Sequence, residues 1–304
     1  MIKRLRKSAG GNSPVPRGTR PRNILRTRSI VTYGFLLTAA IYWLLPLYVM
    51  MVTSLKGLPE IRLGNIFSPP IQVTFEPWAK AWASACTGLN CDGLRSGFAN
   101  SVKILVPSTL VSIFIASISG YSISFWKFRG SELFFALLLL GAFIPYQIMI
   151  YPLVILLREL GLFASVGGIV LIHTVFGMPI LTLLFRNYFA SLPADVIKAA
   201  RVDGAGFWTI FALFVVPMSV PIFMVALVLQ VTGIWNDFLL SVIYVGTPNF
   251  PMTVQLNNIV NSTQGVKEYN VNMAATLLTG LLPLSVYLLS GKFFLREIST
   301  GAIR

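Results

Sequence analysis

One polar stretch between two apolar segments holds most of the residues whose types and spacing could do chemistry. Ser191 is a favourable N-cap, Pro193 fits a first helical turn, and Asp195 suits the positive end of a helix. Gly204 is placed to end such a helix. The stretch therefore predicts a helix of about 12 residues over 192–203.

This helix has the chemistry of a docking element rather than of a catalyst. The three-and-four spacing puts Leu192, Val196 and Ala199 on one face. The small side chains of Ala199 and Ala200 would let the helix lie close to a groove in a partner protein. The alternative is an ordinary helix that rests on the bilayer surface.

Catalytic groups are scarce elsewhere in the chain. His173 is the only histidine, so a histidine-centred triad or a multi-histidine metal site has no further members. Gly291 and Lys292 lack the glycine spacing and the following hydroxyl of a phosphate-binding loop. Asp237 is the main carboxylate in an apolar segment, whereas ion-coupled carriers need buried carboxylates. We therefore expect no catalytic residue, no metal site and no bound cofactor, and an energy source outside this chain.

The composition is that of a membrane protein. Of the 304 residues, 55% are hydrophobic and 11% are charged, and the mean hydropathy is +0.76. Roughly 30 Å of hydrocarbon takes about 20 apolar residues to cross as a helix. The sequence predicts an all-α integral membrane protein with six transmembrane helices, at about 30–55, 104–126, 133–157, 166–185, 217–235 and 273–294.

Basic residues predict the orientation of these spans. Residues 1–29 carry many Lys and Arg and no acidic residue, which predicts a cytoplasmic tail ahead of a six-span domain over 30–304. Six spans put both termini in the cytoplasm, residues 56–103 in an outer loop, and residues 186–216, with the predicted docking helix, inside the cell. The net charge of +14 gathers beside the membrane, which favours attraction to anionic lipid over nucleic-acid binding.

The long outer loop is predicted to be ordered. An oxidising compartment would allow Cys86 and Cys91 to form a disulfide, and two free thiols are the alternative. Residues 76–85 are compatible with a short surface helix. Trp78 and Trp82 are typical of a membrane interface, and contact with a periplasmic partner is the alternative.

The spacing in the polar stretch resembles the coupling loop of ATP-binding-cassette importer permeases. In that family the pattern is Glu-Ala-Ala, three residues, Gly, nine residues, then Ile-x-Leu-Pro. Ala199, Ala200, Gly204 and Pro217 are in register, and Lys198 replaces the glutamate. The resemblance implies a MetI-like permease fold in a bacterial inner membrane. It also implies that Lys198, Ala199, Ala200, Asp203, Gly204 and Pro217 belong to the element that couples the chain to an ATPase.

Further strings are similar to the carbohydrate branch, which includes the maltose-type permeases. They include Asn100-Ser101, Phe185-Arg186-Asn187-Tyr188 and Trp235-Asn236-Asp237-Phe238, and the outer segments look most like permeases for glucose, mannose or glucosylglycerol. The resemblance implies a second permease subunit, an ATPase homodimer that binds ATP and Mg, a periplasmic solute-binding protein and a sugar substrate. Transport would proceed by alternating access.

A sugar pathway needs hydrogen-bonding groups and aromatic faces within the membrane. The candidates are Tyr146, Gln147, Gln230, Trp235 and Asn236, and the alternative for each is a contact between helices. Three other functions remain as alternatives: an importer of the same architecture for another small solute, an ion-coupled secondary carrier, and a membrane enzyme acting on lipid-linked sugars.

Overall fold

The computed structural model describes residues 22–87, 90–126, 128–262 and 266–301, and all the regular structure in these ranges is helical. The chain divides into two compact units, Met1–Val49 and Met50–Arg304. Most of the predicted cytoplasmic tail, residues 1–21, lies outside the described residues. The predicted all-α class is therefore confirmed for the described part of the chain.

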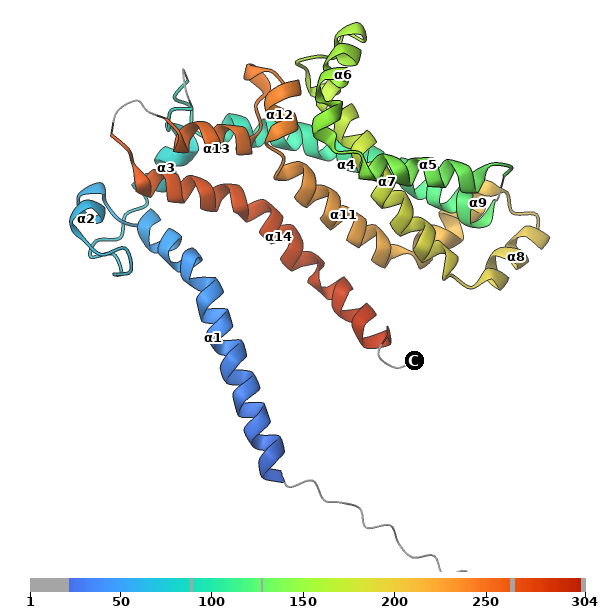
Figure 1. Cartoon of the computed structure of the whole chain (residues 1–304), viewed down its shortest axis with the longest axis horizontal. Coiled ribbons are helices and arrows are strands. Elements are labelled where there is room, and N and C mark those ends of the chain that lie inside the picture. The colour runs from blue at the N-terminus through green and yellow to red at the C-terminus, as the bar shows by residue number, and fades with distance from the viewer. Residues whose placement is uncertain (1–21, 88–89, 127, 263–265, 302–304) are drawn as a thin grey trace, which may run out of the picture. The chain divides into compact units, whose positions relative to one another are not determined.

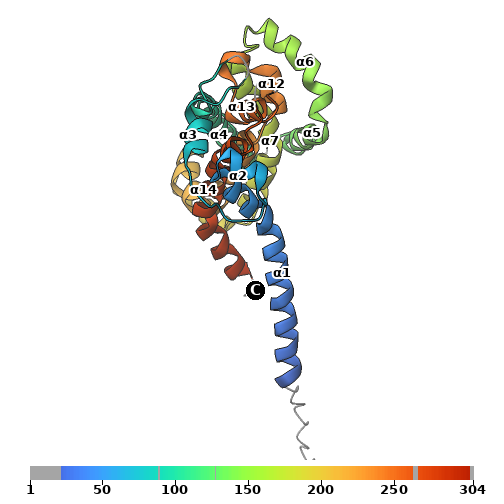
Figure 2. The same cartoon turned by 90° about the vertical axis from the view of Figure 1, so that its left-hand side faces the viewer.

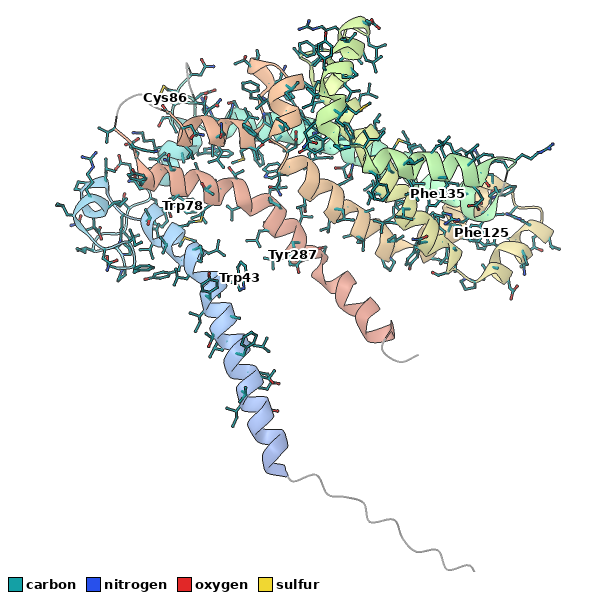
Figure 3. The ribbon with its side chains drawn as sticks, viewed as in Figure 1. Trp43, Trp78, Cys86, Phe125, Phe135 and Tyr287 are labelled. Atoms are coloured by element: carbon teal, nitrogen blue, oxygen red, sulfur yellow. A yellow bond between two sulfur atoms is a disulfide. The ribbon has the colours of Figure 1, made fainter. Side chains whose placement is uncertain are left out.

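The described residues of the first unit, 22–49, all belong to helix α1 (Arg22–Ser54), whose last residues are part of the second unit. Its segment Ser29–Ser54 is 26 residues long and apolar enough to cross a membrane. Apolar side chains such as Trp43 lie on the surface of this helix (Figure 3). Lipid is the environment that suits such a surface.

Three long helices form the centre of the second unit: α4 (Arg95–Phe125), α7 (Val166–Ala190) and α11 (Val220–Trp235). Figures 1 and 2 show them packed along one another, with α14 (Tyr269–Gly301) against α11. Small residues on α4 let α7 approach closely. A Cβ added to Gly120 would lie 2.7 Å from Cβ of Phe185 and 2.9 Å from the backbone nitrogen of Arg186, so this crossing has no room for a larger residue.

Two of the predicted spans are bent rather than straight. The run at 133–157 is divided into α5 (Ser131–Phe143) and α6 (Tyr146–Glu159), with a bend of 103° between them. Pro145 explains this break, because proline has no N–H to donate and disfavours a helical conformation at the residue before it, Ile144, which is extended.

The run at 217–235 belongs to a second bent pair. It begins earlier than predicted, with α9 (Phe207–Ile210), a π-helical turn (Phe211–Val215) and α10 (Val216–Met218), and bends by 81° before α11. Pro217 and Pro221 lie on either side of this break and lack the backbone donors a continuous helix needs. By length and composition, four described helices could cross a membrane, or six if each bent pair is one span.

The ends of the straight helices also differ from the predicted limits. Helix α4 begins at Arg95 rather than near residue 104, and α7 continues to Ala190 rather than ending near residue 185. Hydropathy marks the part of a helix that lies in hydrocarbon, whereas backbone hydrogen bonds continue beyond it. The predicted span limits therefore mark where the apolar sequence begins and ends, and the helices extend beyond them.

Short helices gather at the end of the second unit opposite to α8 and α9 (Figure 1). They are α2 (Leu58–Leu63), α3 (Glu76–Ala83), α12 (Leu239–Tyr244) and α13 (Met252–Val260). Trp78 on α3 donates from Nε1 to Ser54 Oγ over 3.2 Å, and the Trp82 ring lies 5.7 Å from that of Phe98. Both tryptophans thus have structural contacts within this unit.

Cys86 and Cys91 form a disulfide just after α3, beside the Cys86 position labelled in Figure 3. So small a ring contributes about 2 kcal/mol to stability in the chain-entropy model. We expect the unreduced, denatured protein to resist alkylation at both cysteines, and replacement of both by serine to lower its melting temperature by a few degrees. Mass spectrometry without reductant checks the first result, and two alkylated cysteines would contradict the disulfide.

Candidate functional site

Helix α8 (Ala194–Val202) connects α7 to α9 at one end of the second unit (Figure 1). It is shorter than the predicted helix, because its N-cap is Pro193 and not Ser191. Ser191 instead ends α7, where its Oγ donates to the carbonyl oxygen of Tyr188 over 2.6 Å. The proline fixes its own φ at −60° in an extended backbone, so α8 begins only after it.

Gly204 ends α8, as predicted. Its φ is +82°, in the left-handed region that glycine adopts without strain. The Gly204 N–H donates to Arg201 O over 3.0 Å, and the Ala205 N–H donates to Ala200 O over 2.9 Å. These two bonds make a Schellman ending, which satisfies carbonyls that the helix itself leaves unpaired.

Helix α8 has one buried face and one exposed face. Ile197 and Ala200 are 3% and 5% exposed and join an apolar cluster formed by α4, α7 and the α9–α11 segment. The opposite side, called here the exposed face of α8, consists of Asp195, Lys198, Ala199 and Val202. Val202 is 87% exposed although it is apolar.

The structure separates the residues of the predicted docking face. Ala200 faces the core, and Leu192 is half-buried against the same cluster, so neither belongs to the exposed face. The reason is the 100° turn per residue, which places Ile197 and Ala200 together and puts Ala199 and Val202 on the other side. Ala199 keeps the predicted position.

An aromatic cluster fixes the region around α8 to α4. The Tyr121 hydroxyl donates to Phe207 O over 3.2 Å and accepts from Trp126 Nε1 over 2.7 Å. The Phe207 ring lies 4.7 Å from that of Tyr121 and 5.5 Å from that of Trp126. The start of α9 is thereby held against the end of α4.

Arg201 connects α8 itself to the same end of α4. Its guanidinium lies 4.4 Å over the Trp126 ring and donates to the carbonyl oxygen of Phe125, which Figure 3 shows at this end of the unit. Together with the burial of Ile197 and Ala200, these contacts attach α8 to the end of α4 and to the apolar cluster that α7 shares.

The charged residues of the loop are exposed. Lys198 Nζ lies 3.1 Å from Asp195 Oδ1, with side chains 72% and 95% exposed. Such an exposed pair contributes little to stability, so both groups remain available to a partner. Asp203 is exposed at the C-cap of α8. Pro217 lies on α10 beside the second bend and not on α8, so it belongs to the bent span.

Two of the predicted pathway residues connect helices to one another. Gln230 on α11 donates from Nε2 to Ser112 Oγ over 2.8 Å and lies directly against Gly177 of α7. Trp235 is 2% exposed and donates from Nε1 to Thr279 O over 2.8 Å. Both side chains therefore donate hydrogen bonds to other helices of this chain.

The other pathway candidates are exposed. Tyr146 and Gln147 lie at the start of α6, next to the first bend, and Asn236 caps the end of α11. Among the described residues, no hydrogen bond or ring contact joins any two of the five candidates. The structure thus leaves three of them free to meet a solute and does not bring the five into one cluster.

The sequence draws attention to His173 and Asp237 separately but does not predict that their side chains meet. His173 Nε2 lies 3.6 Å from Asp237 Oδ2, and both side chains are largely buried. Asp237 also accepts from the N–H and Oγ of Ser241, in the first turn of α12. The two residues are far apart in the sequence, so no local pattern could have predicted the pair.

The described chain is a bundle of apolar helices with the character of a multi-pass membrane protein. One face of α8 is buried against this bundle and the other face is exposed. Residues 109–299 match the family described as "Binding-protein-dependent transport system inner membrane component". The chain belongs to this family, and the expected family of importer permeases is confirmed.

Similar proteins cover nearly the whole chain. The osmoprotective compounds uptake permease protein GgtD of Synechocystis sp. is 31% identical over 274 residues, which cover 88% of this chain and 90% of GgtD. The glucose import system permease protein GlcU of Saccharolobus solfataricus is 28% identical, over 88% of this chain and 92% of GlcU. The alpha-glucoside transport system permease protein AglG of Rhizobium meliloti is 30% identical, over 82% of this chain and 65% of AglG.

A solved structure shows the same fold. It is the crystal structure of a bacterial ABC transporter involved in the import of the acidic polysaccharide alginate, with a TM-score of 0.76 and 22% identity. The likeness covers 88% of this chain and 97% of that chain. The expected fold of importer permeases is thereby confirmed.

Proposed function

We propose that this chain is the permease subunit of an ATP-driven sugar importer, and that α8 couples it to the ATPase. The observation that supports this most strongly is the two-sided character of α8: Ile197 and Ala200 anchor it to the spans, while Ala199 and Val202 are exposed. GlcU is a glucose import permease and AglG is an alpha-glucoside transport permease, and the similarity to both supports a sugar as the cargo.

In this proposal the chain is not an enzyme. An ATPase homodimer binds ATP and Mg and docks on the exposed face of α8, and a second permease subunit completes the pathway. Closure of the ATPase dimer moves α8, and the spans rock with it because Arg201 of α8 lies over Trp126 at the end of α4, where Tyr121 also holds the start of α9. A periplasmic solute-binding protein delivers the sugar from outside.

The orientation follows from the basic tail at 1–29, which favours the cytoplasm and its anionic lipids. With six spans over 30–304, α8 and both termini are cytoplasmic, and α3, α13 and the disulfide are outside. Within the pathway, we assign solute contact to Tyr146, Gln147 and Asn236. Gln230 and Trp235 hold the helices that position them.

The complete complex tests this function directly. It is reconstituted in proteoliposomes with the ATPase dimer, the second permease and the solute-binding protein, and uptake of radiolabelled D-glucose is measured. We expect uptake that requires ATP on the ATPase side and survives dissipation of ion gradients by ionophores. Uptake that proceeds without ATP and stops with ionophores would instead identify an ion-coupled carrier, and ATP-driven uptake of other solutes alone would exclude the sugar.

Replacement of Gly204 by valine is expected to uncouple ATP hydrolysis from uptake. A left-handed conformation costs an L-residue about 1–2 kcal/mol and a β-branched one more, so the ending of α8 has to change. Gly206→Val is the matched control, because Gly206 has a negative φ and, like Gly204, nothing within 4 Å of an added Cβ. The measurement is sugar imported per ATP hydrolysed, and an equal ratio in the two variants would contradict the role of Gly204.

A further inference from the structure

A polar cavity lies at the end of the second unit opposite to α8. Its volume is 310 Å³, and it is enclosed by the end of α3, the disulfide segment, the end of α13 and the start of α14. Cys86, labelled in Figure 3, lies at its wall. This volume is at the small end of the range for small-molecule sites, about 300–1,000 Å³.

The apolar part of the cavity lining, called here its floor, also includes the side-chain amide of Asn272. Ala85, Ile259 and Val271 provide apolar surface. Asn272 is only 8% exposed, and its side chain has no hydrogen-bond partner among the described residues. Its amide is not among the enclosed side-chain atoms that lack a partner, so it opens into the cavity, where a ligand or water can complete its hydrogen bonds.

The rim of the cavity is polar and held in place. Lys80 Nζ lies 2.6 Å from Glu268 Oε2 and 2.8 Å from Oε1, which joins α3 to the start of α14. Ser84 and Ser262 add hydroxyl groups that have no side-chain partner in the described part of the chain. Donors and acceptors therefore surround an apolar floor from several sides.

We propose that this cavity is an outer subsite for a hydroxyl-rich ligand, a single pyranose ring. Each sugar hydroxyl both donates and accepts, which suits an amide, a carboxylate and an ammonium group arranged around one space. The C–H face of the ring packs on Ile259 and Val271. The inference rests on the proposed function, since it gives the imported sugar a place to bind where the solute-binding protein would release it.

A small ligand fits the cavity better than a protein surface does. The cavity that Asn272 lines holds 310 Å³, which suits one small molecule and not a broad protein surface. Stable protein interfaces instead need about 800 Å² on each partner. A side chain of the solute-binding protein is the competing occupant, and it is an outcome of the test.

The test uses saturation-transfer NMR with D-glucose as the probe, on the whole complex in nanodiscs without the solute-binding protein. We expect saturable transfer to the ring protons of glucose. In Asn272→Leu, the affinity for glucose, measured from the same signals, should be about fivefold weaker. Asn261→Leu is the control, because Asn261 is exposed at the end of α13 and, among the described residues, its side chain bonds to Asn257 alone. An unchanged melting temperature shows that the variants fold alike, and Glu268→Gln is a second variant that keeps the shape of the rim.

Transfer that is absent, or equal in wild type, Asn272→Leu and Glu268→Gln, would overturn the subsite. So would weaker binding of the solute-binding protein to Asn272→Leu with no transfer to glucose, because the cavity would then receive a protein side chain. ATP-driven uptake is measured in parallel at saturating sugar. If glucose does not bind to the cavity but ATP-driven uptake is intact, the subsite is contradicted and the proposed function stands. If glucose binds but no ATP-driven uptake occurs, the proposed function is contradicted and the subsite stands.

Discussion

Glutamate at both Ala199 and Val202 is expected to abolish sugar import while the two permease subunits still assemble. Both residues lie on the exposed face of α8, where the proposed ATPase docks. A carboxylate buried in that contact without a partner costs about 3–5 kcal/mol, which lowers the affinity for the ATPase a hundredfold or more. Co-purification of the ATPase and ATP-driven uptake measure the effect.

Ala194→Glu is the matched control for this variant. Ala194 is an exposed alanine on the same helix, but it lies in the first turn, where a negative charge is favourable. We expect the control to retain the ATPase and import. A double-glutamate variant that binds the ATPase normally and imports sugar would show that the exposed face of α8 is not the docking site.

Replacement of Ile197 by aspartate is expected to have the opposite pattern: the ATPase still binds and hydrolyses ATP, but little sugar is imported. Ile197 is 3% exposed in the cluster that joins α8 to α4 and α7. Loss of its burial costs about 2–3 kcal/mol, and the buried carboxylate adds to that cost, so α8 detaches from the spans. We expect sugar imported per ATP hydrolysed to fall at least about tenfold, a loss equivalent to 1.4 kcal/mol of coupling.

Ile197→Val tests whether the effect comes from lost anchoring. This change keeps an apolar side chain of the same branched shape and costs only about 0.5–1.5 kcal/mol. It is expected to import sugar at nearly the wild-type ratio. If the aspartate variant also retained that ratio, α8 would not transmit motion through its buried face.

The spans could be predicted because lipid requires long uncharged segments, and these are visible in the sequence. Their bends could not, although Pro145 and Pro217 are plain to see. Prolines occur within the straight helices too, as Pro107 does in α4 and Pro179 in α7. Whether a proline only removes one bond or turns the chain depends on the packing around it, which a hydropathy profile does not contain.

The helix predicted over 192–203 lies at 194–202 and ends at Gly204 as expected, but the sequence did not show which of its faces is buried. Gly204 acts locally, through its own φ, so the sequence was sufficient there. Which alanine faces the core depends on where α4 and α7 lie, and only the structure shows that Ala200 does. The contact that Gln230 makes between helices could not be predicted for the same reason, since Ser112 and Gly177 come from two helices that are distant in the sequence.

The central claim is that the exposed face of α8 contacts the ATPase while its buried face does not. Photo-crosslinking from single positions of the assembled complex in native membranes tests it most directly, with benzoylphenylalanine at Val202 and, in a second variant, at Ile197. We expect an adduct between this chain and the ATPase subunit from position 202 and none from position 197. Adducts of position 202 with lipid alone, or an ATPase adduct from position 197 only, would contradict the account.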